Sequence, residues 1–194
     1  FNSLIVLDHK GTIQTQYDKH HLVPFGEYVP FRDILSFGPV AQALSTTGDF
    51  SAGSGLKTLY TMSTSFSPLI CYEVIFPGKS VSTSMDRPEF ILNLTNDAWY
   101  GDTTGPRQHL AMSQARAIET GLPLLRSAGT GISAAIDPYG RIISSIPLNQ
   151  SGYTSGYLPR PLPSTLYLKY GEKLFGLIWL FFVGIALLHR KKTV

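Results

Sequence analysis

The sequence predicts an α/β domain, because segments typical of strands alternate along the chain with a segment typical of a helix. The 194 residues are enough for one domain of ordinary size, and 43% of them are hydrophobic while 15% are charged. This balance favours a packed core over disorder. Because the chain begins at Phe1, already within a predicted strand, we expect it to be part of a longer protein.

Two segments have the pattern of a β-hairpin. Residues 4–7 and 12–15 flank the turn Asp-His-Lys-Gly, and residues 132–136 and 141–143 flank the turn Asp-Pro-Tyr-Gly. Aspartate opens such turns by accepting backbone hydrogen bonds, and glycine tolerates the positive φ near their end. Each segment is therefore expected to form two antiparallel strands.

Two further strands are expected at residues 67–71 and 90–94. Both runs are apolar enough to be buried on both faces of a sheet. Residues 144–163 are rich in Ser, Gly and Pro, a composition typical of a linker.

A helix is expected over residues 108–120. Leu110, Met112, Ala115 and Ile118 approximate one apolar face of this helix. The following Gly-Leu-Pro is a typical helix stop, because glycine favours a left-handed cap and proline cannot continue the helix.

A transmembrane helix is expected near the C-terminus. Residues 174–188 carry no charged side chain and are apolar on every face. Because about 20 apolar residues span a bilayer, we extend this helix upstream to about 167–188, with Lys169 and Lys173 reaching the interface. A buried C-terminal helix of a soluble domain is the alternative.

This helix divides the chain into a main domain at residues 1–160 and a segment at 161–194 with a linker, the transmembrane helix and a basic tail. Without Arg190, Lys191 and Lys192, the chain has 13 basic and 13 acidic side chains, so the formal net charge of +3 comes from the tail. A basic tail after an apolar helix favours a cytoplasmic C-terminus and places the main domain outside. The domain itself shows no basic face for nucleic acid.

Nothing in the sequence indicates a metal or another cofactor. His20 and His21 are adjacent, and adjacent side chains on a strand point to opposite faces, so they do not converge on one ion. The single cysteine excludes an internal disulfide.

The chemistry is expected at that cysteine. Cys71 ends an apolar strand, Tyr72 and Glu73 follow it, and Lys19 lies upstream. A lone cysteine in such a place is most often an inert core residue, and a lone lysine is most often at the surface. Together, a thiol, a lysine and nearby acids can supply a nucleophile, an electrophile and proton handling, which points to acyl transfer through a thioester.

Three motifs carry a resemblance to a known family. They are residues 17–27 (Tyr-Asp-Lys-His-His-Leu-Val-Pro-Phe-Gly-Glu), 69–73 (Leu-Ile-Cys-Tyr-Glu) and 94–101 (Leu-Thr-Asn-Asp-Ala-Trp-Tyr-Gly). In this order they resemble the carbon–nitrogen hydrolase (nitrilase) superfamily, and within it the bacterial apolipoprotein N-acyltransferases. Shorter matches at residues 106–109, 115–119 and 123–126 extend the resemblance over nearly the whole chain, which looks like the C-terminal portion of such a protein.

The resemblance implies an α-β-β-α sandwich with a Glu–Lys–Cys triad. The triad's first glutamate, the general base, has no match among the 18 residues before Lys19. We therefore expect it upstream of this chain, and we expect the chain alone to be inactive. The matched positions are Cys71 as nucleophile, Lys19 as triad lysine, Glu27 as the second glutamate, Tyr72 and Glu73 beside the thiol, and Trp99 near the acyl pocket.

The implied reaction moves a fatty acyl group from a phospholipid, through a thioester on Cys71, to the α-amine of the N-terminal diacylglyceryl-cysteine of an apolipoprotein. Lys19 and the N–H of Tyr72 would hold the oxyanion. The resemblance also implies the bacterial inner membrane, with the catalytic domain on the periplasmic side. The alternatives are a carbon–nitrogen hydrolase acting on a small amide, with the same triad, and a non-catalytic membrane-anchored module.

Three roles stay open at this stage. Glu27 either supports the site or is a surface carboxylate, and Glu73 either takes part in the reaction or accepts backbone N–H bonds where the strand turns. Residues 31–44 are apolar with few charges, which fits a lid at the lipid interface or a core helix.

Overall fold

The computed structural model describes residues 1–31 and 49–192 and confirms the α/β class. Its centre is a six-stranded sheet whose strands lie side by side in chain order. The strands are β3 (Leu59–Tyr60), β4 (Ser65–Ile70), β5 (Phe90–Asn96), β6 (Leu124–Gly129), β7 (Ser133–Ile136) and β8 (Ile142–Ile146). The β4–β5 and β5–β6 pairs are parallel, and the other pairs are antiparallel.

The two apolar strands predicted at 67–71 and 90–94 are confirmed as β4 and β5, although Cys71 lies just beyond the end of β4. Side chains alternate between the two faces of a strand, so β4 contributes to two separate cores. On one face, Leu69 packs with Ile91 and with Leu110 of the long helix. On the other face, Phe66 and Ile70 pack with the N-terminal hairpin.

Both predicted hairpins are confirmed. Strands β1 (Ser3–Leu7) and β2 (Ile13–Asp18) form a separate two-stranded antiparallel sheet, and β7 pairs with β8. In each turn an aspartate accepts two backbone N–H bonds through one oxygen. Asp8 accepts them at 2.8 Å each and Asp137 at 2.9 Å each. These bonds fix the turns by the mechanism that the sequence predicts.

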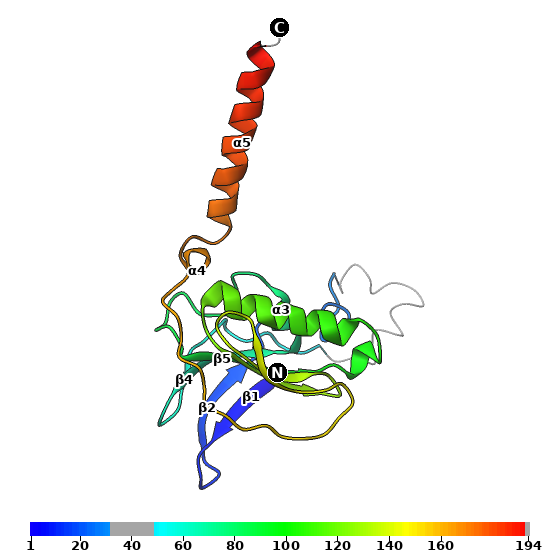
Figure 1. The fold of residues 1–194 in the computed structure, drawn as a ribbon. Helices are drawn as coiled ribbons and strands as arrows, with labels where there is room; N and C mark the ends of the chain where they lie inside the picture. The colour runs from blue at the N-terminus through cyan, green and yellow to red at the C-terminus, as the bar shows by residue number, and fades with distance from the viewer. Residues whose placement is uncertain (32–48, 193–194) are drawn as a thin grey trace, which may run out of the picture.

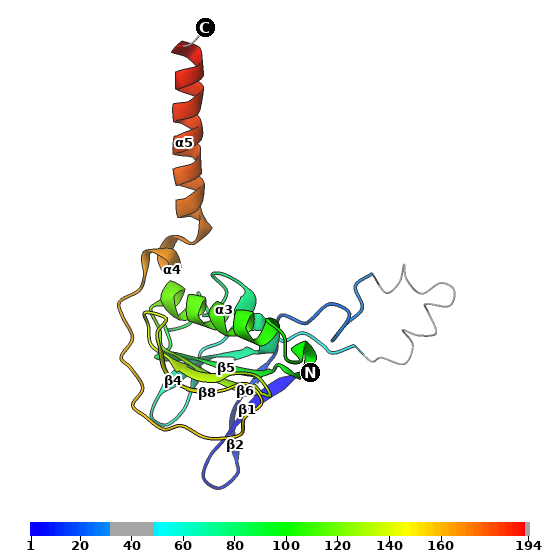
Figure 2. The ribbon, with the colours of Figure 1, turned by 45° about the vertical axis from the view of Figure 1, so that its right-hand side comes forward.

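The N-terminal hairpin is held against β4 by its buried side chains. Leu4 and Tyr17 lie in one cluster with Phe66, Ile70 and Phe90. In both views of the ribbon, helix α3 (Gly105–Thr120) lies over one face of the sheet and the hairpin lies on the opposite side (Figures 1 and 2). This packing brings the end of β2, just before Lys19, close to the end of β4, just before Cys71.

The predicted helix is confirmed as α3, which ends at the expected residue and begins at Gly105 instead of residue 108. Its predicted apolar face is confirmed at Leu110 and wrong at two other positions. Met112 and Ile118 are 39% and 53% exposed, whereas His109 and Arg116 are buried. The buried face thus combines apolar residues with polar side chains that find hydrogen-bond partners, so burial here follows hydrogen bonding as well as hydrophobicity.

The continuous helix predicted over about 167–188 is wrong at its start. The structure has two helices, α4 (Leu166–Tyr170) and α5 (Glu172–Lys192), separated at Gly171. The φ angle of Gly171 is +55°, which suits glycine and ends α4. Helix α5 then projects away from the sheet in both views (Figures 1 and 2). Among the helices of residues 1–31 and 49–192, none combines the length and the apolar character that crossing a membrane requires.

Three other findings complete the comparison. Strand β8 takes the first residues of the predicted linker at 144–163, and residues 150–162 contain no helix or strand. The sequence did not predict β3 or β6. Most of the segment at 31–44, with its alternative roles as lid or core helix, lies outside the described residues.

Candidate functional site

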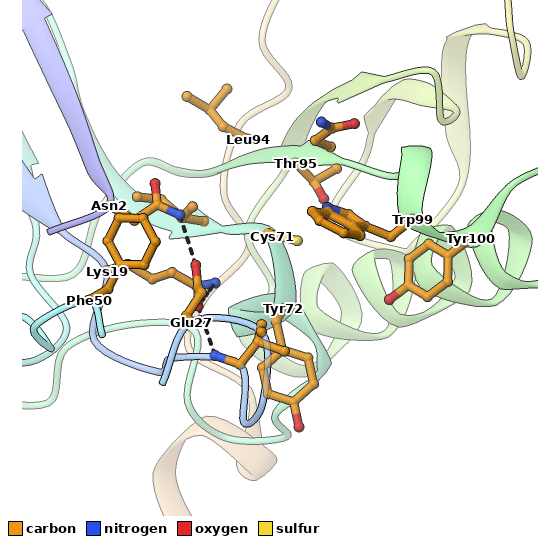
Figure 3. A pocket seen from close by; sticks show the side chains of 14 residues that line it. Asn2, Lys19, Glu27, Phe50, Cys71, Tyr72, Leu94, Thr95, Trp99 and Tyr100 are labelled. Carbon is orange, nitrogen blue, oxygen red and sulfur yellow. Dashed lines mark hydrogen bonds and ion pairs between the residues drawn. The ribbon is translucent and has the colours of Figure 1, made fainter. Parts of the chain in front are cut away.

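A cavity of about 680 Å³ opens where β4 and β5 end. The carboxyl ends of parallel strands are a common place for a ligand, because the segments that leave them diverge. Two short helical turns follow the strands, η1 (Cys71–Ile75) and η2 (Ala98–Tyr100). The lining includes Asn2, Lys19, Glu27, Phe50, Cys71, Tyr72, Leu94, Thr95, Trp99 and Tyr100 (Figure 3).

Cys71 occupies a strained position at the start of η1. Its φ angle is +52°, in the left-handed region that residues other than Gly, Asn and Asp rarely adopt. Such a conformation costs about 1–3 kcal/mol and persists only where the surroundings enforce it. The thiol is free and partly exposed, and it borders the cavity. A sharp turn between a strand and a helix therefore presents the sulfur to a ligand.

Lys19 follows β2 and is buried, with 1% of its side chain exposed. Its Nζ lies 2.6 Å from Glu27 Oε2, and its backbone N–H donates to Asn2 O at 2.8 Å. An ammonium group leaves water only where a carboxylate compensates for the lost hydration. The structure thus brings Lys19 to the cavity as a paired cation, and not to the surface.

Glu27 is held by three donors. Its Oε2 accepts from Lys19 Nζ and from the Val23 N–H at 2.7 Å, and its Oε1 accepts from Asn2 Nδ2 at 3.0 Å. Burial raises the pKa of Glu27, but these hydrogen bonds and the charge of Lys19 outweigh burial and lower its pKa overall. Glu27 is therefore an ionised partner of Lys19, and the reading as a surface carboxylate is excluded.

Glu73 lies behind the cavity and is 1% exposed. Its Oε1 accepts from the Tyr17 hydroxyl at 2.7 Å and from the N–H groups of His20 and His21 at 2.8 and 3.0 Å. Its Oε2 accepts from the Ile70 N–H at 2.7 Å. Of the two roles that the sequence left open, these contacts fit the structural one, because the carboxylate ties the Lys19 segment to the Cys71 turn.

Tyr72 and Trp99 complete the predicted set. Both line the cavity, and Trp99 is 88% exposed. In Figure 3 the Cys71 sulfur lies between the Lys19–Glu27 pair and the Trp99 side chain. The structure therefore gathers the predicted residues around one space, with Glu73 as a support outside the lining.

Sequence reasoning missed several residues of this region. Asn2, which binds Glu27, gives no signal in the sequence. Asp97, His109 and Arg126 form a buried polar cluster beside the cavity. All three fall inside segments that carry the family resemblance, at residues 94–101, 106–109 and 123–126, and that was the available signal.

The family model for carbon–nitrogen hydrolases matches residues 1–162. The chain belongs to the carbon–nitrogen hydrolase family. Curated relatives in this family share much of its sequence. An apolipoprotein N-acyltransferase from Bradyrhizobium diazoefficiens is 47% identical over 173 residues, which cover 89% of this chain and 32% of the relative. One from Rhodopseudomonas palustris is 40% identical over 192 residues, which cover 98% and 36%. The chain thus spans about a third of the length of these relatives.

Solved structures support the carbon–nitrogen hydrolase fold. A double mutant of the amidase from Nesterenkonia sp. AN1 in complex with acrylamide superposes with a TM-score of 0.55 at 22% identity, covering 91% of this chain and 61% of that one. A carbon–nitrogen hydrolase superfamily protein from Xanthomonas campestris gives 0.53 at 22% identity, covering 77% and 54%. These similarities establish a nitrilase-like α/β fold.

The role of Glu73 as a support is testable by Glu73→Gln. One carboxylate oxygen becomes an amide NH₂, which faces a donor whichever way the amide is turned. Because a buried donor then loses its acceptor, the free energy of unfolding should fall by about 1–3 kcal/mol in urea titration. Glu89→Gln is the matched control, since Glu89 is exposed, and it should stay within about 0.5 kcal/mol of wild type. Wild-type stability of Glu73→Gln would contradict the role.

Proposed function

We propose that this chain carries the nucleophile of an apolipoprotein N-acyltransferase. The reaction transfers a fatty acyl group from a phospholipid to the α-amine of the N-terminal diacylglyceryl-cysteine of an apolipoprotein. The observation that carries this proposal is the placement of Cys71, Lys19 and Glu27 around one cavity, in a chain whose curated relatives are named for this activity. The volume of this cavity, about 680 Å³, is in the usual range for a ligand site.

Cys71 acts in two steps. In the first, its thiolate attacks the acyl carbonyl of the phospholipid ester, and the glycerol oxygen leaves and takes a proton. In the second, the amine of the apolipoprotein attacks the thioester and gives up a proton to the base, the thiolate leaves, and an amide forms. A thiol suits both steps, because the thiolate is a strong nucleophile and also a good leaving group.

Lys19 and Tyr72 hold the charge that develops on the carbonyl oxygen. The ammonium group of Lys19 is fixed by Glu27 before the reaction begins. The N–H of Tyr72 belongs to the first turn of η1, where N–H groups have no partner within the helix. Donors that are already in place stabilise an oxyanion without reorganisation during the reaction.

Proton transfer needs a further base. Among the described residues that line the cavity, Glu27 is the only carboxylate, and its lowered pKa makes it a weak proton acceptor. We therefore assign Glu27 to Lys19 and expect the general base to be a different carboxylate, as the resemblance implies.

The lining favours a fatty acyl chain over a small amide. Val23, Phe50, Leu94 and Trp99 contribute apolar surface near Cys71. A carbon–nitrogen hydrolase that acts on a small amide would use the same thiol but would not need this apolar space. Release of free carboxylate from a small amide, in the absence of phospholipid, would favour that second function.

Helix α5 attaches the chain to a membrane in this proposal. Large apolar side chains are exposed along it, among them Phe175, Trp179, Leu180, Phe181 and Leu187, with exposed fractions of 57–67%. Apolar surface of this extent is costly in water and is a mark of contact with lipid or with another protein. We propose that this membrane is the bacterial inner membrane, with the catalytic domain on its periplasmic side, as the resemblance implies.

Thioester trapping tests the nucleophile. The intact protein is incubated with phospholipid, and Cys71 should gain an acyl adduct that mass spectrometry detects and hydroxylamine removes. Cys71→Ala should carry no such adduct and form no product. Product formation by Cys71→Ala would exclude the proposed intermediate.

Lys19→Met tests the oxyanion donor. Loss of one such donor typically lowers kcat by about 10²–10³, so turnover of phospholipid should fall by this factor. Lys19→Arg should not restore it, because a planar guanidinium does not replace a single ammonium at this position. Lys79→Met, a change at an exposed lysine, should leave kcat unchanged. Full activity of Lys19→Met would refute the assignment.

Membrane attachment is tested by flotation of the 194-residue chain with vesicles of phosphatidylethanolamine and phosphatidylglycerol. The double change Leu180→Asp and Phe181→Asp should reduce the bound fraction by at least about tenfold, because each buried carboxylate costs about 2.5–3.5 kcal/mol in a bilayer. Tyr157→Asp, at a fully exposed residue outside α5, is the control. Undiminished binding of the double variant would place the attachment elsewhere.

A further inference from the structure

Arg126 is a buried cation beside the cavity, and the proposed reaction gives it no role. It lies on β6, and its side chain is 0% exposed. One terminal nitrogen donates to Asp97 Oδ2 at 2.6 Å, the other donates to the amide oxygen of Asn93, and Nε donates to the Ile132 carbonyl at 3.2 Å. A buried charge is tolerated only where ion pairs and hydrogen bonds compensate for its lost hydration. Here those partners connect Arg126 to two parts of the site, the turn with Trp99 and Tyr100 and the strand before Cys71.

The first branch leads through Asp97 to the aromatic wall. Asp97 follows β5, its N–H donates to Gly129 O, and its carbonyl accepts from the Tyr100 N–H at 3.0 Å. It directly precedes η2, which supplies Trp99 and Tyr100 to the cavity. Asp97 therefore links Arg126 and this wall, because its backbone starts the turn that forms the wall while its carboxylate is held by Arg126.

His109 reinforces this branch from α3. Its Nδ1 lies 2.9 Å from Asp97 Oδ1, and because a carboxylate only accepts, Nδ1 is the donor. Its ring packs edge-on against the Tyr100 ring, with centroids 5.8 Å apart. Arg126 NH2 also lies 3.1 Å from the same Nδ1, so the three side chains form one cluster. The helix and the sheet thus hold the aromatic wall between them.

The second branch leads through Asn93 to the nucleophile. Asn93 is fully buried in β5, and its Nδ2 donates to the Leu69 carbonyl at 3.1 Å. Leu69 is the register partner of Asn93 in β4 and stands two residues before Cys71. Because Cys71 keeps its left-handed φ only while its surroundings hold it, the position of this strand end controls the position of the sulfur.

We infer that Arg126 is a positioning residue that couples the aromatic wall of the cavity to the strand that carries Cys71. Its planar guanidinium presents separate N–H donors to Asp97, Asn93 and Ile132 at the same time. An ammonium group is a point charge without this fork, so the coupling depends on arginine and not only on positive charge.

Electrostatics supports the same arrangement. Burial lowers the pKa of Arg126, and the negative charges of Asp97 and of the Cys71 thiolate oppose that effect. The consequences for turnover rest on the proposed function, whereas the two branches are properties of the structure itself.

The experiment compares four variants of the intact protein: Arg126→Lys, Asn93→Ala, Asp97→Asn and, as control, Arg141→Lys. Arg141 makes a similar pair with Asp137, but its side chain is 72% exposed.

Two measurements do not depend on acyl transfer. The first is the rate of Cys71 alkylation by iodoacetamide, followed by mass spectrometry. The second is the fluorescence anisotropy of Trp99 in a background where Trp179 and any other tryptophan are replaced by Phe. Thermal melting confirms that each variant is folded.

Arg126→Lys should slow alkylation by about tenfold or more, because the sulfur relaxes away from its position beside Lys19, and it should also lower the anisotropy of Trp99. Asn93→Ala should slow alkylation alone. Asp97→Asn should lower the anisotropy alone and, in the acyltransferase assay, raise KM for phospholipid more than it lowers kcat. Arg141→Lys should match wild type in every measurement.

Wild-type behaviour of Arg126→Lys in both measurements would overturn the inference, since charge alone would then suffice. It would also be overturned if Asn93→Ala and Asp97→Asn changed both measurements equally, which would indicate general loosening. If a folded Arg126→Lys cannot be obtained, the separation between Asn93→Ala and Asp97→Asn decides. Should the protein show no acyl transfer, the proposed function fails while the alkylation and anisotropy results still test the coupling.

Discussion

The Glu73 carboxylate joins two segments that are distant in sequence, and the geometry of the cavity depends on this contact. Its two oxygens accept hydrogen bonds from Tyr17, His20 and His21 on the Lys19 side and from Ile70 on the Cys71 side. Hydrogen bonds to a charged group contribute about 1.5–3 kcal/mol each, and a buried carboxylate without them is strongly destabilising. The cation and the thiol are therefore held in register by one side chain that lines neither wall of the cavity.

Two buried ion pairs lie on different elements of the region around the site. Lys19 pairs with Glu27 on the side of the N-terminal hairpin, and Arg126 pairs with Asp97 on the side of β6. Replacing a buried ion pair by well-packed apolar residues is often neutral or stabilising, so these pairs are poorly explained as sources of stability. Their value lies in placing full charges at fixed positions near Cys71, in surroundings where charges act over longer distances than in water.

The sequence predicted those parts of the fold that are determined locally. The aspartates that open the hairpin turns, the apolar strands β4 and β5, and the glycine stop after Thr120 all act within a few residues.

Contacts between distant segments were not predictable in the same way. Glu73 bonds to His20 across 53 positions of the chain, and no local pattern separates this role from a catalytic one. The buried face of α3 was missed for the same reason, because His109 and Arg116 find their partners on other elements. Strand β6 was missed because Arg126 interrupts its apolar pattern, and that arginine is buried through partners on other segments, Asp97, Asn93 and Ile132.

The roles of the carboxylates follow from their hydrogen-bond and ion-pair partners. Glu27 is already bonded to Lys19, Asn2 and Val23, so protonating it would weaken three hydrogen bonds and leave the ammonium without its counter-charge. A group in that position serves the reaction by staying ionised. Lys19 then remains a cation while charge develops on a neighbouring oxygen, which is the condition for a preorganised electrostatic site. Asp97 is likewise committed to Arg126 and His109. A general base gains and loses a proton in each cycle, so it cannot be committed to as many fixed hydrogen bonds and ion pairs as these carboxylates are. This is the physical reason to assign the proton transfer to a different residue.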